Sequence, residues 1–210
     1  ADEEELSGNE PRVERVAGAY VAAGSQVVLT NTFRANRIAL AAHPEVERIA
    51  EVNRAGVEVS RRAAGEDACV FASIGPCGKL LVTGEVDEAT LRAAFEEQAQ
   101  ALAAGGADAI VVETMSDLTE AAIALEAAKA TGLPVVACMV FDSGKNRDRT
   151  MMGVTPTQAA EELTRFGADA IGANCGTGID DYIPICASLK AATDLPIWIK
   201  PNAGIPELEN

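Results

Sequence analysis

The sequence has one histidine, few aromatic residues and fewer basic than acidic residues. The shortages of histidine and of positive charge each exclude a class of function. Its single histidine, His43, precedes Pro44 at an expected helix start, so we expect neither a histidine-rich metal site nor a Ser-His-Asp triad. Against 32 Asp and Glu there are 17 Lys and Arg, a formal net charge of −15. A chain of this charge repels phosphate backbones, which makes nucleic acid an unexpected partner. Its longest apolar runs are strand-sized, far short of the ~20 residues that cross a bilayer, so no membrane span is expected.

The five cysteines, at positions 69, 77, 138, 175 and 186, are odd in number and irregularly spaced. Most lie within apolar segments. This pattern is typical of free thiols in a reducing compartment and not of a disulfide framework. A cytoplasmic location is therefore expected.

Short β-branched runs alternate with longer stretches that are rich in Ala, Glu and Arg. The runs are nearly continuous in apolar residues, as in strands that are buried on both faces. The expected strands are 26–31, 69–74, 109–113, 135–141, 170–174 and 197–200. The expected helices are 10–23, 44–64, 87–104, 117–130, 156–166 and 180–192.

An internal repeat indicates how these units are arranged. The segments Gly106-Ala107-Asp108-Ala109-Ile110 and Gly167-Ala168-Asp169-Ala170-Ile171 each end a helix and open a strand. A period of about 61 residues for two βα units favours a (β/α)8 TIM barrel, although doubly wound α/β sheets share the alternation. Six strands are fewer than eight, so the sequence predicts either an open sheet or part of a longer barrel protein.

In a barrel, chemistry lies where strands meet the loops that follow them. Glu113 ends a strongly apolar run, so its carboxylate must be paired, protonated or available to a ligand. Alternatively, the Glu113 carboxylate accepts hydrogen bonds from neighbouring loop amides and has only a structural role. Cys175 lies between Asn174 and a Gly-Thr-Gly turn, where it is either a metal ligand or a packing residue. That turn could offer amides to an anion, but no phosphate-loop or dinucleotide motif accompanies it.

The strand ends carry six motifs that occur, in this order, in the homocysteine S-methyltransferase family. The chain resembles that family over essentially its whole length, and most closely the homocysteine-binding barrels of cobalamin-dependent methionine synthases. The motifs are Thr30-Asn31-Thr32-Phe33-Arg34-Ala35-Asn36, Ser73-Ile74-Gly75-Pro76, Val112-Glu113-Thr114-Met115-Ser116-Asp117, Thr150-Met151-Met152-Gly153-Val154-Thr155-Pro156, Gly172-Ala173-Asn174-Cys175-Gly176 and Pro201-Asn202-Ala203-Gly204.

The resemblance implies one (β/α)8 barrel domain over residues 1–210, truncated at both ends, with the first and eighth strands missing. It also implies zinc-dependent transfer of a methyl group to the thiol of homocysteine, which gives methionine. The family holds Zn²⁺ through three cysteines, of which Cys175 matches one. The other two are adjacent in a Gly-Gly-Cys-Cys-Gly segment that these 210 residues do not contain, so we expect this chain not to hold catalytic zinc by itself.

By the same resemblance, Glu113 would bind the amino group of homocysteine, and Asn31, Thr32 and Asn174 would line the site. The methyl donor stays open among methylcobalamin, betaine and S-methylmethionine. The implied partners are homocysteine, the methyl donor and a cobalamin-binding domain or protein. Two alternatives remain: a barrel lyase or aldolase that acts on a phosphorylated small molecule, and a relative that has lost its zinc site.

Overall fold

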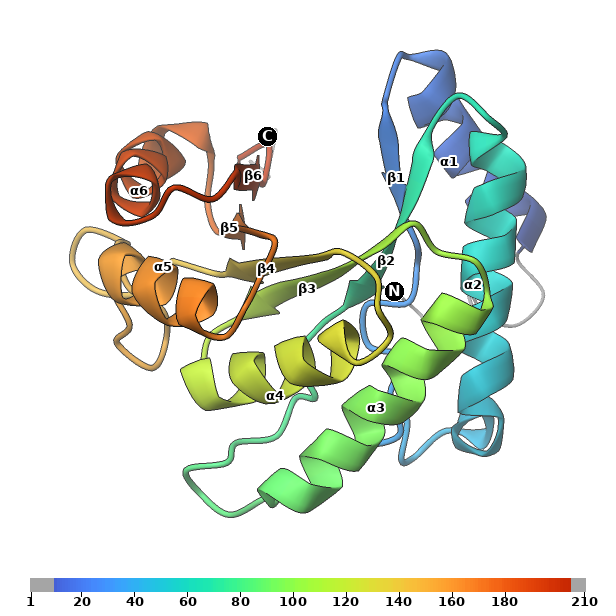
Figure 1. The fold of residues 1–210 in the computed structure, drawn as a ribbon, viewed down its shortest axis with the longest axis horizontal. Coiled ribbons are helices and arrows are strands. Elements are labelled where there is room, and N and C mark those ends of the chain that lie inside the picture. Colours follow the sequence, from blue (N-terminus) through green and yellow to red (C-terminus); the bar gives the residue numbers. More distant parts are fainter. Residues whose placement is uncertain (1–9, 205–210) are drawn as a thin grey trace, which may run out of the picture.

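A computed structural model describes residues 10–204 as six parallel strands that alternate with helices (Figure 1). Residues 1–9 and 205–210, which belong to the expected domain 1–210, lie outside the described range. The strands are β1 (Val27–Leu29), β2 (Cys69–Ile74), β3 (Ala109–Met115), β4 (Val135–Met139), β5 (Ala170–Cys175) and β6 (Ile197–Pro201). The helices are α1 (Glu10–Ala22), the 3-10 helix η2 (Pro44–Arg48), α2 (Ile49–Ala64), α3 (Glu88–Ala104), α4 (Leu118–Lys129), α5 (Pro156–Arg165) and α6 (Ile179–Ala192).

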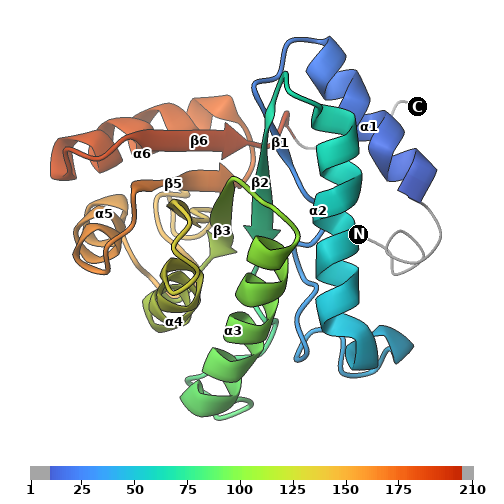
Figure 2. The ribbon, with the colours of Figure 1, turned by 45° about the vertical axis from the view of Figure 1, so that its right-hand side comes forward.

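The sheet has the strand order β1-β2-β3-β4-β5-β6, so each strand pairs with its neighbours in sequence. The helices lie along its outer side, and the sheet curls (Figure 2). The curl brings Phe71 of β2 against Trp198 of β6, with ring centroids 5.7 Å apart, although three strands lie between them in the sheet. The predicted barrel architecture is therefore confirmed for the six described strands, and the doubly wound alternative is excluded.

Alternation along the strands divides the side chains between two faces. One set faces the helices in the main core, which is rich in alanine and branched aliphatic residues. The other set forms a small apolar cluster on the concave face: Leu29, Phe71, Val111, Val136, Cys138, Ala170 and Trp198. Burial on both faces explains why the strands read as continuous apolar runs.

The repeated Gly-Ala-Asp segments have one structural role in both copies. Asp108 accepts a hydrogen bond from the backbone N–H of Val70 at 2.6 Å, and Asp169 accepts one from that of Val135 at 2.7 Å. Each carboxylate thus holds the first residues of the preceding strand. Each also pairs with a basic residue near the end of a preceding helix, Arg61 for Asp108 and Lys129 for Asp169.

Four predicted boundaries need correction. The strand expected at 109–113 continues to Met115 as β3. The strand expected at 26–31 is reduced to β1, because the amide of Ser73 donates to the Thr30 hydroxyl at 3.0 Å and leaves the ladder. The strand expected at 135–141 ends at Met139. The helix expected at 44–64 is a 3-10 turn followed by α2. Among residues 10–204, no helix is long and apolar enough to cross a membrane.

Candidate active site at the strand ends

The carboxyl ends of four strands meet at the carboxylate of Glu113. Side chains two or four positions apart on a strand face the same side. Ser73, Glu113, Asn174 and Lys200 therefore face the same side of the sheet as the concave apolar cluster, on β2, β3, β5 and β6 respectively. Glu113 Oε1 accepts a hydrogen bond from Ser73 Oγ at 2.6 Å. Glu113 Oε2 accepts from Lys200 Nζ at 2.8 Å and from Asn174 Nδ2 at 3.2 Å. A polar layer therefore lies above the apolar floor of the barrel.

Asn174 is fixed in one orientation by its neighbours. Its Oδ1 accepts from the backbone N–H of Thr114 at 2.7 Å, which directs its Nδ2 group toward Glu113 and Cys175. The Nδ2 atom lies 2.6 Å from Thr114 Oγ1 and 3.4 Å from Cys175 Sγ. Because Asn174 is buried, an inverted amide would leave a backbone donor facing an N–H₂ group, at a cost of about 1–3 kcal/mol.

Two residues beside Asn174 have left-handed backbone conformations, Thr114 at φ 63° and Cys175 at φ 62°. Such conformations are uncommon outside glycine, and for a β-branched residue such as Thr114 they cost about 1–3 kcal/mol. The β3–β4 register shifts between Val112 and Met115, at the same level. The strained ends bring Thr114 Oγ1 to 3.6 Å from Cys175 Sγ, a cluster of backbone strain that is typical of functional sites.

The described residues do not form a complete zinc centre. No group of three His, Cys, Asp or Glu within residues 10–204 is arranged to hold a metal ion. Cys175 is half-buried with its thiol at the site, whereas Cys77 and Cys138 are buried. Burial raises the pKa of the Cys77 thiol to about 12 and that of Cys138 further above its ordinary value. Of the thiols near the strand ends, Cys175 alone is partly exposed at this site and so could serve as a metal ligand.

The other two predicted site residues lie apart from this group. Thr32 is fully buried and its hydroxyl donates to the Ser73 carbonyl at 2.8 Å, so it supports Ser73 from behind. Asn31 borders a groove between α1, β1 and β6, and its buried Oδ1 has no hydrogen-bond partner among the described residues. The structure thus brings Glu113, Asn174 and Cys175 together and leaves Asn31 and Thr32 at the margin.

Sequence reasoning missed Ser73 and Lys200 as site residues. Ser73 stands at the end of a strand inside one of the six motifs, and Lys200 is a lysine in an otherwise apolar strand. Both signals were present. Their contact with Glu113 depends on the register, which pairs Asn174 with Lys200, and on the curl of the sheet.

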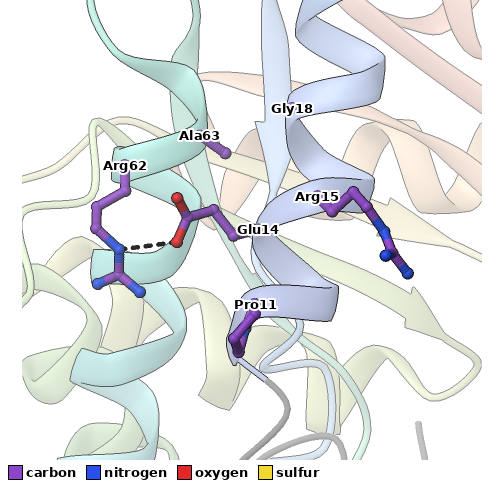
Figure 3. Close-up of a pocket in the computed structure, with 6 residues that line it drawn as sticks. All are labelled: Pro11, Glu14, Arg15, Gly18, Arg62 and Ala63. Atoms are coloured by element: carbon purple, nitrogen blue, oxygen red, sulfur yellow. Dashed lines mark hydrogen bonds and ion pairs between the residues drawn. The ribbon is translucent and has the colours of Figure 1, made fainter.

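Lys200 also borders the groove that Asn31 lines. This groove has a volume of about 680 Å³ and is lined mainly by apolar residues of α1 and β1, with Trp198 of β6. A second hollow of about 420 Å³ lies between α1 and α2, where Glu14 and Arg62 form an ion pair at 2.9 Å (Figure 3). It lies in the outer helical layer and contains none of the site residues.

The turn that follows Cys175 is poorly suited to an anion. Helix α6 begins after Gly178, but its first turn carries Asp180 and Asp181. A hydrogen bond from Thr177, together with Arg147, lowers the pKa of the Asp181 carboxyl, so this group is charged at neutral pH. Carboxylates at the helix start oppose phosphate binding, which weighs against a phosphorylated substrate.

Comparison with known proteins gives a consistent result. The methionine synthase of Mycobacterium tuberculosis is 31% identical over 201 residues, which cover 90% of this chain and 17% of that protein. The methionine synthase of Mycobacterium leprae is 29% identical over 205 residues, which cover 93% of this chain and again 17% of that protein. The chain therefore spans about a sixth of the length of these relatives.

Among solved structures, the homocysteine methyltransferase MmuM from Escherichia coli in its metallated form superposes with a TM-score of 0.81. The match covers 96% of this chain and 75% of that one, at 22% identity, and it confirms the barrel fold. The family model for homocysteine S-methyltransferases matches residues 2–210. The chain belongs to the homocysteine S-methyltransferase family.

Proposed function

We propose that this chain binds homocysteine and takes part in the transfer of a methyl group to its thiol, which gives methionine. The observation that carries the proposal is the buried Glu113 carboxylate, held by side chains of three other strands beside the accessible Cys175. Glu113 Oε2 already accepts from the Lys200 ammonium, so the carboxylate has the charge and the acceptor position that a ligand ammonium group needs. Family membership and the two methionine synthase relatives support the same substrate.

In this proposal the side chains of the site have separate tasks. Glu113 binds the α-ammonium of homocysteine. Asn174 holds Glu113 in place and lies beside Cys175, so the amino acid end of the substrate would lie at β3 and its thiol end at the end of β5. Asn31 borders the adjoining groove beyond the end of β1, and Thr32 supports the site from behind through its hydrogen bond to Ser73 of β2.

The proposed role of Cys175 is to bind zinc. When bound, zinc would lower the pKa of the substrate thiol and so supply a thiolate nucleophile. Cys175 would be one thiolate ligand of such an ion, and the relative from E. coli was solved in a metallated form. The described residues supply this ligand and do not complete the set.

The methyl donor and its carrier belong to the same proposal. Because the chain matches about a sixth of each methionine synthase, we infer that residues 1–210 act as a single homocysteine-binding barrel domain. Its partner would be a cobalamin-binding domain or protein that presents methylcobalamin. The free cysteines and the thiol substrate suit the reducing cytoplasm.

Binding of L-homocysteine, measured by isothermal titration calorimetry, tests the proposal. Glu113→Gln removes the charge and keeps the shape, so the affinity should fall about ten-fold or more, as expected for a charged hydrogen-bonded pair. Glu161→Gln, on the exposed face of α5, is the matched control and should bind as the wild type does. Equal binding by wild type and Glu113→Gln, or no binding by the wild type, would contradict the assignment.

A further inference from the structure

The three donors that surround Glu113 differ in their freedom to move. Ser73 and Asn174 are each 1% exposed. The Ser73 amide donates to the Thr30 hydroxyl, and Asn174 Oδ1 accepts from the backbone amide of Thr114, so both residues are fixed on a second side. The Lys200 side chain is 45% exposed, whereas that of Glu113 is 7% exposed. Lys200 can therefore leave the carboxylate for solvent without uncovering a buried polar group, while the other two donors cannot.

A ligand ammonium that binds Glu113 meets a position already held by a cation. The Lys200 ammonium and an α-ammonium have the same charge and the same donor geometry. Two such cations on Glu113 Oε2 would repel each other at short range in a poorly solvated site. Binding of an amine at Glu113 therefore requires Lys200 to move away.

An α-amino acid offers Lys200 a new partner in the same event. Its carboxylate is one carbon from its ammonium, so it lies within reach of the flexible lysine stem. Glu113 and Lys200 together carry no net charge, and a zwitterion adds none. An amine without a carboxylate would leave one excess positive charge, and an acid without an amine one excess negative charge.

We propose that Lys200 is a specificity residue that occupies the ammonium position of Glu113 until a zwitterionic α-amino acid binds. The ligand ammonium then replaces Lys200 at Glu113 Oε2, and the displaced Lys200 pairs with the ligand carboxylate. No covalent bond changes in this exchange. It rests on the proposed function, because it assigns the substrate class and the carboxylate contact of the same site.

Three thiols test the exchange by calorimetry: L-homocysteine, 3-aminopropane-1-thiol, which lacks the carboxylate, and 4-mercaptobutanoate, which lacks the amine. They are titrated into the wild type, Lys200→Met and Lys200→Arg, with Lys190→Met on the exposed face of α6 as the matched control. Both amines must displace Lys200, so the ratio of their affinities isolates the carboxylate contact. The absolute affinity for the aminothiol reports the competition at Glu113.

Lys200→Met should bind 3-aminopropane-1-thiol more tightly than the wild type does, because the competing cation is gone. Its preference for homocysteine over the aminothiol should fall by about ten-fold or more, equivalent to about 1.4 kcal/mol, and 4-mercaptobutanoate should bind more weakly. Lys200→Arg and Lys190→Met should keep the wild-type preference. If Lys200→Met does not fold, Lys200→Gln gives the same comparison.

Other results would overturn the exchange. If Lys200 only orients Glu113, Lys200→Met weakens both amines together and leaves their ratio unchanged. If Lys200 plays no part in binding, all affinities equal those of the wild type. A wild type that binds neither amine removes the proposed function and the exchange together, whereas a wild type that binds homocysteine with an unchanged ratio removes the exchange alone.

Discussion

The hydroxyl of Tyr182 donates to the backbone carbonyl of Asn174 at 2.6 Å, which places the buried tyrosine ring directly against Gly176. This contact joins α6 to the end of β5. It holds the segment that carries Cys175 against the start of the helix. Burial raises the pKa of the Tyr182 hydroxyl, so the group stays protonated and keeps donating at neutral pH.

Gly176→Ala should destabilise the protein by about 2–4 kcal/mol. Gly176 has φ 67°, and an added Cβ would collide with the Tyr182 ring, so the variant combines left-handed strain with overpacking. Gly132→Ala is the matched control, because Gly132 has φ 82° and nothing within 4 Å of an added Cβ. Urea unfolding should show a cost for Gly132→Ala of about 1–2 kcal/mol. Equal losses of unfolding free energy for the two variants would mean that the Tyr182 ring moves aside without cost, which would contradict the prediction.

Asp169→Ala should lower the free energy of unfolding by about 1–3 kcal/mol at neutral pH, because it leaves the buried Val135 amide without its acceptor. The loss is read from urea unfolding against Asp67→Ala, an exposed aspartate, as the control. A loss no larger than that of the control would be evidence against this contact.

The effect of Asp169 should also depend on pH. The pKa of the Asp169 carboxyl is lowered in the folded state, chiefly by its hydrogen bond to Lys129. Its contribution is therefore complete above the unfolded pKa of about 3.9 and is lost as the pH falls through the lower folded value. The difference between wild type and Asp169→Ala should shrink toward pH 2–3, roughly. A constant difference across that range would contradict the ion pair.

Alkylation of the native protein should distinguish the five cysteines. Cys69 is exposed and Cys175 and Cys186 are half-buried, so these three thiols should react with iodoacetamide at mildly alkaline pH. Cys77 and Cys138 are buried and their thiol pKa values are raised, so they should react only after denaturation. Peptide mass spectrometry reads each site, and rapid labelling of Cys138 in the folded protein would be inconsistent with this barrel interior.

The 210-residue chain should bind zinc weakly. Structural zinc sites reach apparent binding energies of about 10–16 kcal/mol with complete ligand sets, whereas residues 10–204 offer Cys175 without two further ligands. In competition with a chromophoric chelator, Cys175→Ser should abolish the weak binding at this site, and Cys186→Ser should leave it unchanged. Tight binding of one zinc per wild-type chain would show that the ligand set is wrong.

Local signals in the sequence predicted most of the fold. The six apolar runs form six strands. Thr155 caps α5, because its hydroxyl accepts a hydrogen bond from the Gln158 amide three residues later. These features depend on neighbouring residues. The end of β1 could not be predicted, because a hydroxyl of Thr30 replaces a carbonyl in the ladder, a choice that depends on the next strand.

The site was likewise predictable only where the signal comes from neighbouring residues in the sequence. Glu113 is conspicuous because a carboxylate follows a buried run, and Cys175 because a glycine turn leaves it accessible. The pairing of Glu113 with Lys200 joins residues 87 positions apart and depends on strand register and curl. The burial of Thr32 behind Ser73 likewise arises from cross-strand packing that no local pattern encodes.

Trp198 is the single tryptophan of the chain, and its ring stacks on Phe71 on the concave face, two residues before Lys200. Its buried indole N–H has no hydrogen-bond partner among residues 10–204, and the residue borders the same groove as Lys200. Indole emission therefore comes from one position beside the Glu113–Lys200 pair. These 210 residues therefore carry an intrinsic fluorescent probe beside the proposed homocysteine site, without background from a second tryptophan in the same sequence.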